Sequence, residues 1–147
     1  MKIVSFSLLI GTFFLLASCG NREYPGFTES ETGLIYKIHH DNKMPKANPG
    51  DYLLFDAKGQ TFPMQLEKPV FPGDINEALS LMGIGDSATF VIRADSFLLR
   101  NAKVIQLPSF VDEKSKVIFH VKLHNIQTLE ELQLEEQRLI EDARNNE

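Results

Sequence analysis

The sequence predicts an α+β fold, made of antiparallel strands and one short central helix. The helix is indicated by an apolar stripe at helical spacing, formed by Ile75, Ala78, Leu79 and Met82. Gly83 follows this stripe, at the position where helices often end on a left-handed glycine. Beyond the next turn the spacing of apolar residues changes to every second position, which indicates a strand.

Alternating apolar and polar side chains mark the other strands. We expect them at residues 33–39, 51–56, 59–66 and 116–126, which gives a sheet of about five strands when the strand after the helix is added. Pro63 interrupts one of these segments. Because proline cannot donate to a sheet ladder, that segment is expected at an edge or a bulge.

The N-terminus has the pattern of a bacterial lipoprotein signal peptide. Lys2 supplies a positive charge, the 14 residues from 3 to 16 are apolar, and Leu-Ala-Ser precedes Cys19. The apolar run is too short for a membrane-spanning helix, which needs about 20 residues. The four residues Leu-Ala-Ser-Cys at 16–19 match the lipobox of bacterial lipoproteins, so we expect Cys19 to carry lipid. Cleavage nearby, with Cys19 left as a free thiol, is the alternative.

Lipidation would place the protein in the bacterial cell envelope, anchored to a membrane through Cys19. Gly20 after Cys19 is compatible with sorting to the outer membrane, facing the periplasm. Because Cys19 is the only cysteine, no internal disulfide can form. The expected organisation is a signal peptide at 1–18, a lipidated cysteine and tether at 19–26, a folded domain at 27–127 and a C-terminal helix at 128–147.

Length and charge limit what the mature chain does. Removing 18 of the 147 residues leaves 129, enough for one domain with a core of its own. The remaining 14 basic and 20 acidic residues argue against nucleic acid or an anionic lipid surface as the partner. Thr128 and Glu131 have capping-box spacing and predict a helix that packs weakly, with partner binding as the less favoured alternative.

The order of the elements resembles the FKBP-type peptidyl-prolyl cis/trans isomerases. The resemblance rests on residues 70–97, where a Val-Phe pair precedes the helix, a methionine and glycines end it, and a strand follows. A first strand with Leu-Ile-Tyr-Lys-Ile and a last strand with Phe-x-Val-x-Leu extend it. The resemblance implies an FKBP-like twisted antiparallel sheet wrapped around the central helix. It also implies isomerisation of X-Pro bonds, for which no cofactor is expected.

The resemblance further implies an apolar proline pocket. Its residues would be Phe62, Val70, Phe71, Ile75, Leu98 and Phe119. Ile75 and Leu98 stand where the family has a tryptophan and a tyrosine, and Pro63 stands in place of an aspartate. These departures imply a shallower, less polar pocket and weak activity. The alternative is that the same residues belong to the core of the domain.

The loop at residues 98–110 is rich in apolar side chains, which need something to cover. Two interpretations stay open: it borders the pocket as a flap, or it closes one end of the core. No metal site is expected, because four residues on a strand span about 13 Å, which puts His120 and His124 too far apart to share one ion.

Two functions follow from these observations. The first is a lipid-anchored peptidyl-prolyl isomerase that assists protein folding in the cell envelope, with proline-containing segments of envelope proteins as partners. The alternative is a non-catalytic FKBP-like module that binds or assembles an envelope complex. The two differ in whether the pocket residues converge on an open concavity.

Overall fold

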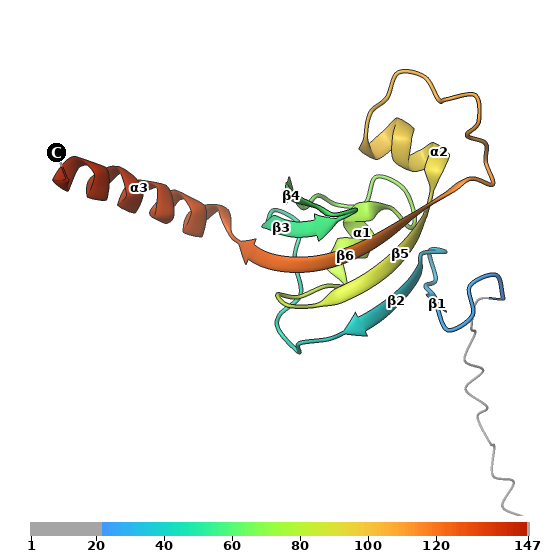
Figure 1. Cartoon of the computed structure of the whole chain (residues 1–147), viewed down its shortest axis with the longest axis horizontal. Helices are drawn as coiled ribbons and strands as arrows, with labels where there is room; N and C mark the ends of the chain where they lie inside the picture. Colours follow the sequence, from blue (N-terminus) through green and yellow to red (C-terminus); the bar gives the residue numbers. More distant parts are fainter. Residues whose placement is uncertain (1–21, 147) are drawn as a thin grey trace, which may run out of the picture.

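The computed structural model describes residues 22–146, so Cys19 and the predicted signal peptide lie outside the described residues. The chain forms a six-stranded antiparallel sheet in the order β1-β2-β5-β6-β3-β4 (Figure 1). The elements are β1 (Thr28–Glu29), β2 (Ile35–His40), β3 (Tyr52–Ala57), β4 (Gln60–Gln65), α1 (Ile75–Ser80), β5 (Ser87–Arg93), α2 (Ala94–Ser96), η1 (Phe97–Asn101), β6 (Lys116–Gln127) and α3 (Leu129–Asn145). The predicted α+β fold is confirmed, with the two-residue β1 as an additional edge strand.

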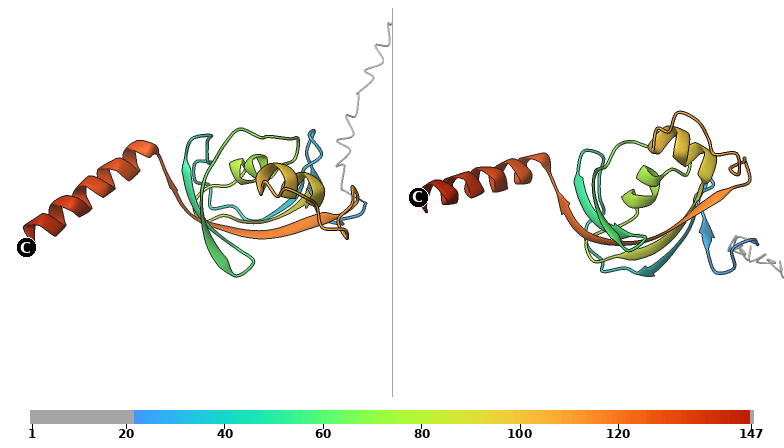
Figure 2. Two further views of the ribbon diagram at one scale, coloured as in Figure 1. Left: turned by 90° about the horizontal axis from the view of Figure 1, so that it is seen from above. Right: turned by 45° about the horizontal axis from the view of Figure 1, so that its top comes forward.

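The sheet curves around α1, which lies in its concave side (Figure 2). Alternate residues of the central strands point inward, and with α1 they form the core, which includes Leu53, Phe55, Ala78, Leu79, Phe90, Ile92 and Leu123. Each fully buried Leu or Phe side chain stabilises the fold by about 1.5–3 kcal/mol relative to an exposed one. All residues of the buried core cluster fall between Leu34 and Leu123, so a fragment beginning at residue 22 retains the complete core.

Helix α1 begins at a buried cap. The side chain of Asp74 accepts a hydrogen bond from the N–H of Glu77 at 2.9 Å, which satisfies one of the free donors of the first turn. The helix ends two residues before Met82, and the left-handed glycine is Gly85, with φ of 87°, not Gly83 as the sequence suggested. Gly83 is required for space instead, because a Cβ there would lie 2.7 Å from the carbonyl oxygen of Met44.

Asp86 fixes the loop before β3 to the turn after α1. Its fully buried carboxylate accepts hydrogen bonds from the N–H groups of Asn42 and Gly83 and from Lys46 Nζ, at 2.7, 2.8 and 2.8 Å. Burial raises the pKa of Asp86, but the bond from Lys46 and those from the two N–H groups outweigh burial and hold the pKa below its ordinary value. Asp86 therefore stays charged in the core and holds the loop in place.

Strand β4 is the edge strand that Pro63 predicts. It pairs only with β3, and Pro63 lies opposite Leu54. The two strands join through Lys58 and Gly59, both with positive φ, as tight hairpins require. The interruption of the ladder at proline therefore falls at the sheet boundary.

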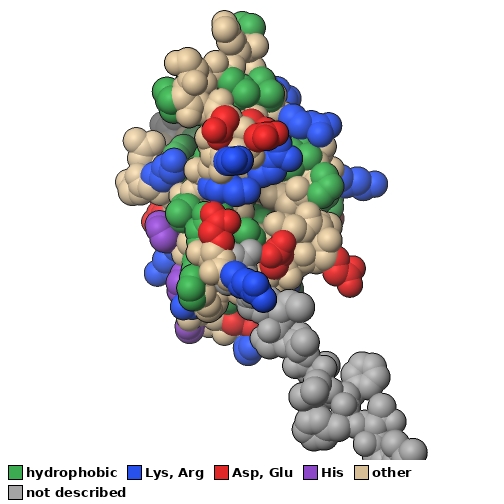
Figure 3. All heavy atoms as spheres, turned by 90° about the vertical axis from the view of Figure 1, so that its right-hand side faces the viewer, with side chains coloured by type: hydrophobic (Ala, Val, Ile, Leu, Met, Phe, Trp, Pro, Cys, Tyr) green, Lys and Arg blue, Asp and Glu red, His purple; other side chains and the backbone are tan. Residues whose placement is uncertain are grey.

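The segment after β5 is helical where a loop was expected. Residues 94–101 form α2 and the π-helical turn η1, and the loop begins only after Asn101. Within that loop, Ile105 and Phe110 are 102% and 82% exposed, so they cover nothing in the domain. Figure 3 shows hydrophobic side chains at the top of this end of the molecule, where the loop lies.

Helix α3 projects from the end of β6, away from the domain (Figure 1). The predicted capping box is present: Thr128 Oγ1 accepts from the N–H of Glu131 at 3.2 Å, and the Glu131 carboxylate accepts from the N–H of Thr128 at 2.7 Å. None of the residues of α3 is buried, as a weakly packed helix should show. Among the described residues, no helix has the length and hydrophobicity that crossing a bilayer requires.

Candidate functional site

An open cavity of about 490 Å³ lies between the start of α1, η1, the β3–β4 hairpin and β6. Its volume falls within the range of small-ligand sites, about 300–1,000 Å³. The residues lining it are Phe55, Ala57, Phe62, Pro63, Met64, Gln65, Glu67, Val70, Ile75, Asn76, Phe97, Arg100, Asn101, Ala102, Lys103 and Phe119. Most of the lining is therefore apolar, with polar groups near α1 and on η1.

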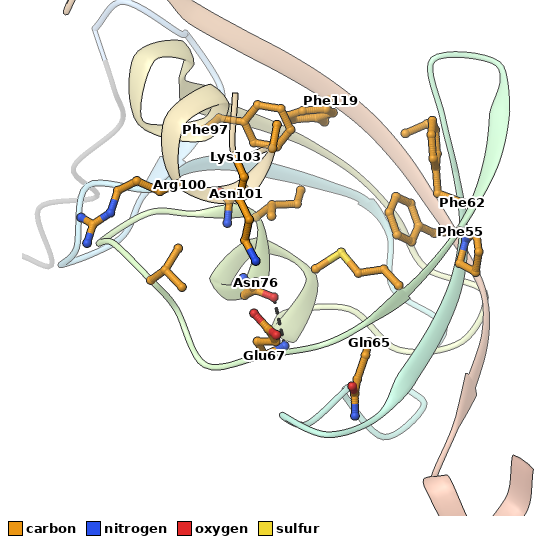
Figure 4. Close-up of a pocket in the computed structure, with 16 residues that line it drawn as sticks. Phe55, Phe62, Gln65, Glu67, Asn76, Phe97, Arg100, Asn101, Lys103 and Phe119 are labelled. Atoms are coloured by element: carbon orange, nitrogen blue, oxygen red, sulfur yellow. Dashed lines mark hydrogen bonds between the residues drawn. The ribbon is translucent and has the colours of Figure 1, made fainter. Parts of the chain in front are cut away.

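Two pairs of phenylalanines line the cavity (Figure 4). Phe97 and Phe119 pack with ring centroids 5.0 Å apart, and Phe55 and Phe62 with centroids 5.9 Å apart. Tilted aromatic pairs at these separations are favourable beyond the area they bury. Ile75, at the first position of α1, also lines the cavity and is 6% exposed. The site is thus a dish with aromatic sides.

The structure brings four of the six expected pocket residues to this cavity: Phe62, Val70, Ile75 and Phe119. Phe71 is not among the lining residues and lies in the buried core. Leu98 also does not line the cavity, because neighbouring residues of a helical turn point in different directions, and its neighbour Phe97 faces inward. Within the expected loop 98–110, the residues 100–103 line the cavity, whereas the side chain that packs on the core, Phe97, precedes the loop. The structure therefore favours the interpretation of this segment as a flap that borders the cavity.

The other twelve of the sixteen lining residues are not among the expected pocket residues, and they include Phe55, Met64, Phe97, Asn76 and Asn101. The alternation of β3 and β4 places Phe55 and Met64 on the inner face, which was a usable signal. No local pattern indicates Asn101, because it contacts a carboxylate 27 residues earlier in the chain, to which Asn76 also donates.

That contact is made by the buried carboxylate of Asp74. Its Oδ2 accepts hydrogen bonds from the N–H of Val70 at 3.0 Å, Asn76 Nδ2 at 3.0 Å and Asn101 Nδ2 at 3.2 Å. Its Oδ1 accepts the capping bond from Glu77. One fully buried side chain thus joins the segment before α1, the helix and η1, which are three walls of the cavity.

The Asn101 side chain is only half satisfied. Its Nδ2 donates to Asp74, but its Oδ1 is buried without a hydrogen-bond partner among the described residues. Since Asp74 offers only acceptors, the Nδ2 group must face it and the carbonyl cannot exchange places with it. An unpaired buried acceptor costs stability. The Asn101 side chain therefore stabilises η1 through the hydrogen bond of its Nδ2 and destabilises it through the unpaired Oδ1.

The histidines lie on the outer face of the sheet, away from the cavity. Thr89 Oγ1 lies between His39 Nε2 at 2.7 Å and His120 Nδ1 at 2.8 Å. His124 Nε2 contacts Asp56 at 2.7 Å. Hydrogen bonds from Thr61 and His124 hold the pKa of Asp56 below its ordinary value. His120 and His124 have separate partners, and no three potential metal ligands come together in residues 22–146.

An antiparallel sheet wrapped around one short helix, with an apolar cavity at the helix start, is the FKBP-type peptidyl-prolyl isomerase fold. FkpA from Escherichia coli has a similar structure, with a TM-score of 0.55 and 21% identity over 72% of this chain and 54% of FkpA. A peptidyl-prolyl cis-trans isomerase from Pseudomonas syringae pv. tomato matches with a TM-score of 0.52 and 16% identity over 71% of this chain and 84% of the isomerase.

The match thus spans about half the length of FkpA, at 54%. The sequence matches no protein-family model and no curated protein. The likeness therefore establishes the fold alone. The evidence for a catalytic activity of this chain lies in its cavity.

Proposed function

We propose that the protein is an FKBP-type peptidyl-prolyl cis/trans isomerase that acts on X-Pro bonds of proteins folding in the bacterial cell envelope. The observation that carries the proposal is the open, aromatic-walled cavity of about 490 Å³ at the start of α1. It occurs in the fold of a solved peptidyl-prolyl isomerase.

Isomerisation of a prolyl bond requires neither a nucleophile nor a cofactor. The barrier to rotation is about 18–20 kcal/mol because resonance holds the peptide planar, and the uncatalysed X-Pro step takes tens to hundreds of seconds. Water stabilises the charge-separated planar amide. A site that removes water and fits the twisted form therefore lowers the barrier.

The cavity has the parts that this mechanism needs. The phenylalanine pairs Phe97/Phe119 and Phe55/Phe62, together with Ile75, would surround the prolyl ring with apolar surface. Phe62 is 39% exposed, so one wall is accessible from solvent. The apolar part of the lining supplies shape and desolvation rather than specific hydrogen bonds to the rotating amide, and we expect slow catalysis.

The test is acceleration of a protein refolding reaction limited by one X-Pro bond, using residues 22–147. Phe62→Ala should lose most of the acceleration, whereas Phe110→Ala, the same change at an 82% exposed residue outside the cavity, should retain it. Ile75→Ala and Ile118→Ala form a second matched pair, inside the cavity and on the outer face of the sheet. No acceleration by a folded domain would contradict the proposal.

The lack of acceleration together with binding of proline peptides would leave the second function, a non-catalytic FKBP-like binding or assembly module of an envelope complex. One feature of the cavity favours this second function: its apolar walls are suited to binding an apolar peptide segment whether or not isomerisation is catalysed. Peptide titration of the same fragment distinguishes the two.

We further propose that lipid on Cys19 anchors the domain to the outer membrane, facing the periplasm. The support is the lipobox before Cys19. Expression of the full chain with Cys19→Ala should move the protein from the membrane fraction to the soluble fraction and abolish its labelling by radioactive palmitate. Retention in the membrane would contradict the anchor without affecting the proposed catalysis.

A further inference from the structure

Two of the three charged residues that line the cavity are positive. Arg100 and Lys103 are among the lining residues, and Glu67 is the one acidic side chain in that set. A third cation, Lys58 at the tip of the β3–β4 hairpin, has its Nζ 5.3 Å from the ring centroid of Phe119. This distance is typical of a cation–π contact. Cations thus border the apolar cavity on the flap and on the hairpin.

These cations are unpaired, in contrast to several others in the domain. Lys43, Lys46 and Arg93 each lie within 4.0 Å of an aspartate carboxylate. Within the described residues, neither Arg100 nor Lys103 makes a salt bridge or a side-chain hydrogen bond, and both are exposed. Their charges are therefore available to a bound molecule.

The flap holds Lys103 in an unusual backbone conformation. Its φ is 54°, a left-handed value that residues other than glycine and asparagine seldom adopt. In Figure 4 its side chain extends from the flap toward the side of the cavity that holds Asn76 and Glu67. The turn thus directs a flexible cation across the opening rather than away from it.

We propose, on the basis of the proposed function, that the cavity selects proline segments carrying Asp or Glu within two residues of the proline. Consecutive Cα atoms are about 3.8 Å apart, so such side chains would reach the rim while the prolyl ring lies between the phenylalanines. The chain as a whole carries a net charge of −5 and would repel an acidic segment, so the attraction must come from the rim.

The test uses residues 22–147 and three peptides that share a Leu-Pro-Phe centre, so that both flanking positions lie two residues from the proline. They carry Glu, Gln or Lys at both positions flanking this centre, and further peptides carry Glu on one side only. Affinity is measured by fluorescence anisotropy and isomerisation by NMR exchange, each at low and high salt. The variants are Arg100→Glu/Lys103→Glu and the control Lys114→Glu, at an exposed lysine outside the cavity.

We expect wild type to bind the Glu peptide roughly fivefold more tightly than the Lys peptide, the size of an exposed ion-pair effect. The preference should fade near 1 M salt, where the Debye length is about 3 Å. The double charge reversal should invert the preference, and Lys114→Glu should leave it unchanged.

The outcomes separate the inference from the function on which it rests. Equal binding and isomerisation of the Glu, Gln and Lys peptides, or a preference unaffected by the double reversal, would overturn the charge selection alone. No binding or isomerisation of any peptide by a domain that circular dichroism shows to be folded would overturn both.

Discussion

Asp74→Ala should destabilise the domain more than the removal of any other single buried polar side chain. The wild-type side chain accepts four hydrogen bonds while fully buried. Its loss would remove the α1 cap and leave donors of Val70, Asn76 and Asn101 without an acceptor. Each lost bond costs at least about 1 kcal/mol, so we expect the free energy of unfolding to fall by about 4 kcal/mol.

Urea unfolding of residues 22–147, followed by far-UV circular dichroism, measures this loss. Because small domains have free energies of unfolding of about 5–15 kcal/mol, the midpoint should drop sharply while the slope stays unchanged. Asp74→Ser keeps a capping oxygen but reaches fewer donors, so it should lie between Asp74→Ala and wild type. A loss below about 1.5 kcal/mol for Asp74→Ala would refute the network as the link between the cavity walls.

Three further predictions follow from local geometry. Gly83→Ala should destabilise the domain by about 2 kcal/mol or more in urea unfolding, because the added Cβ would meet the Met44 carbonyl oxygen at 2.7 Å; wild-type stability would contradict this. The pKa of Asp86 in the folded protein is lowered by its hydrogen bonds, including that from Lys46. Its contribution to stability is therefore fully present above the pKa of aspartate in the unfolded chain, near 4. The contribution is lost as pH falls through the pKa of Asp86 in the folded protein. Asp86→Asn should therefore differ most from wild type at neutral pH, and unfolding curves whose separation does not shrink toward pH 2 would count against it. Asn101→Ala should change stability by less than about 1 kcal/mol, since it removes both a bond and a buried unpaired oxygen, yet lower kcat/KM severalfold by freeing η1; equal activity to wild type would exclude the positioning role.

The fold follows from short-range patterns. Alternation in β3, β5 and β6 and the stripe on α1 predict the elements, because each element directs one set of apolar side chains into the core cluster and that set shows in the spacing. One error occurs where a glycine has two possible roles. Gly83 has the sequence context of a left-handed cap, but it serves a close backbone approach to the preceding loop, a contact that local pattern does not contain.

The candidate site was predicted less completely than the fold. The family resemblance indicates four residues that do line the cavity: Phe62, Val70, Ile75 and Phe119. It also indicates Leu98, but the residue that lines the cavity is the neighbouring Phe97. The prediction of Leu98 is wrong because it assumes a loop, whereas residues 97–101 form a helical turn. In that turn Phe97, and not Leu98, faces the cavity.

The polar supports of the cavity could not be predicted at all. Asn101 follows Asp74 by 27 residues, and their contact depends on how η1 folds back over α1. The same holds for the rim cations, which come from the hairpin at Lys58 and from the flap at Lys103. Charge composition alone gave an acidic chain and no indication that its cavity is bordered by positive charge.

The central claim is that the cavity lowers the barrier to rotation of an X-Pro bond. NMR exchange spectroscopy on a short proline peptide, with and without residues 22–147, tests it directly. We predict that the cis/trans exchange rate rises in proportion to protein concentration, that the cis-to-trans ratio of excess peptide stays constant, and that Phe62→Ala abolishes the increase. An unchanged exchange rate at protein concentrations where peptide resonances shift on binding would contradict catalysis by this cavity.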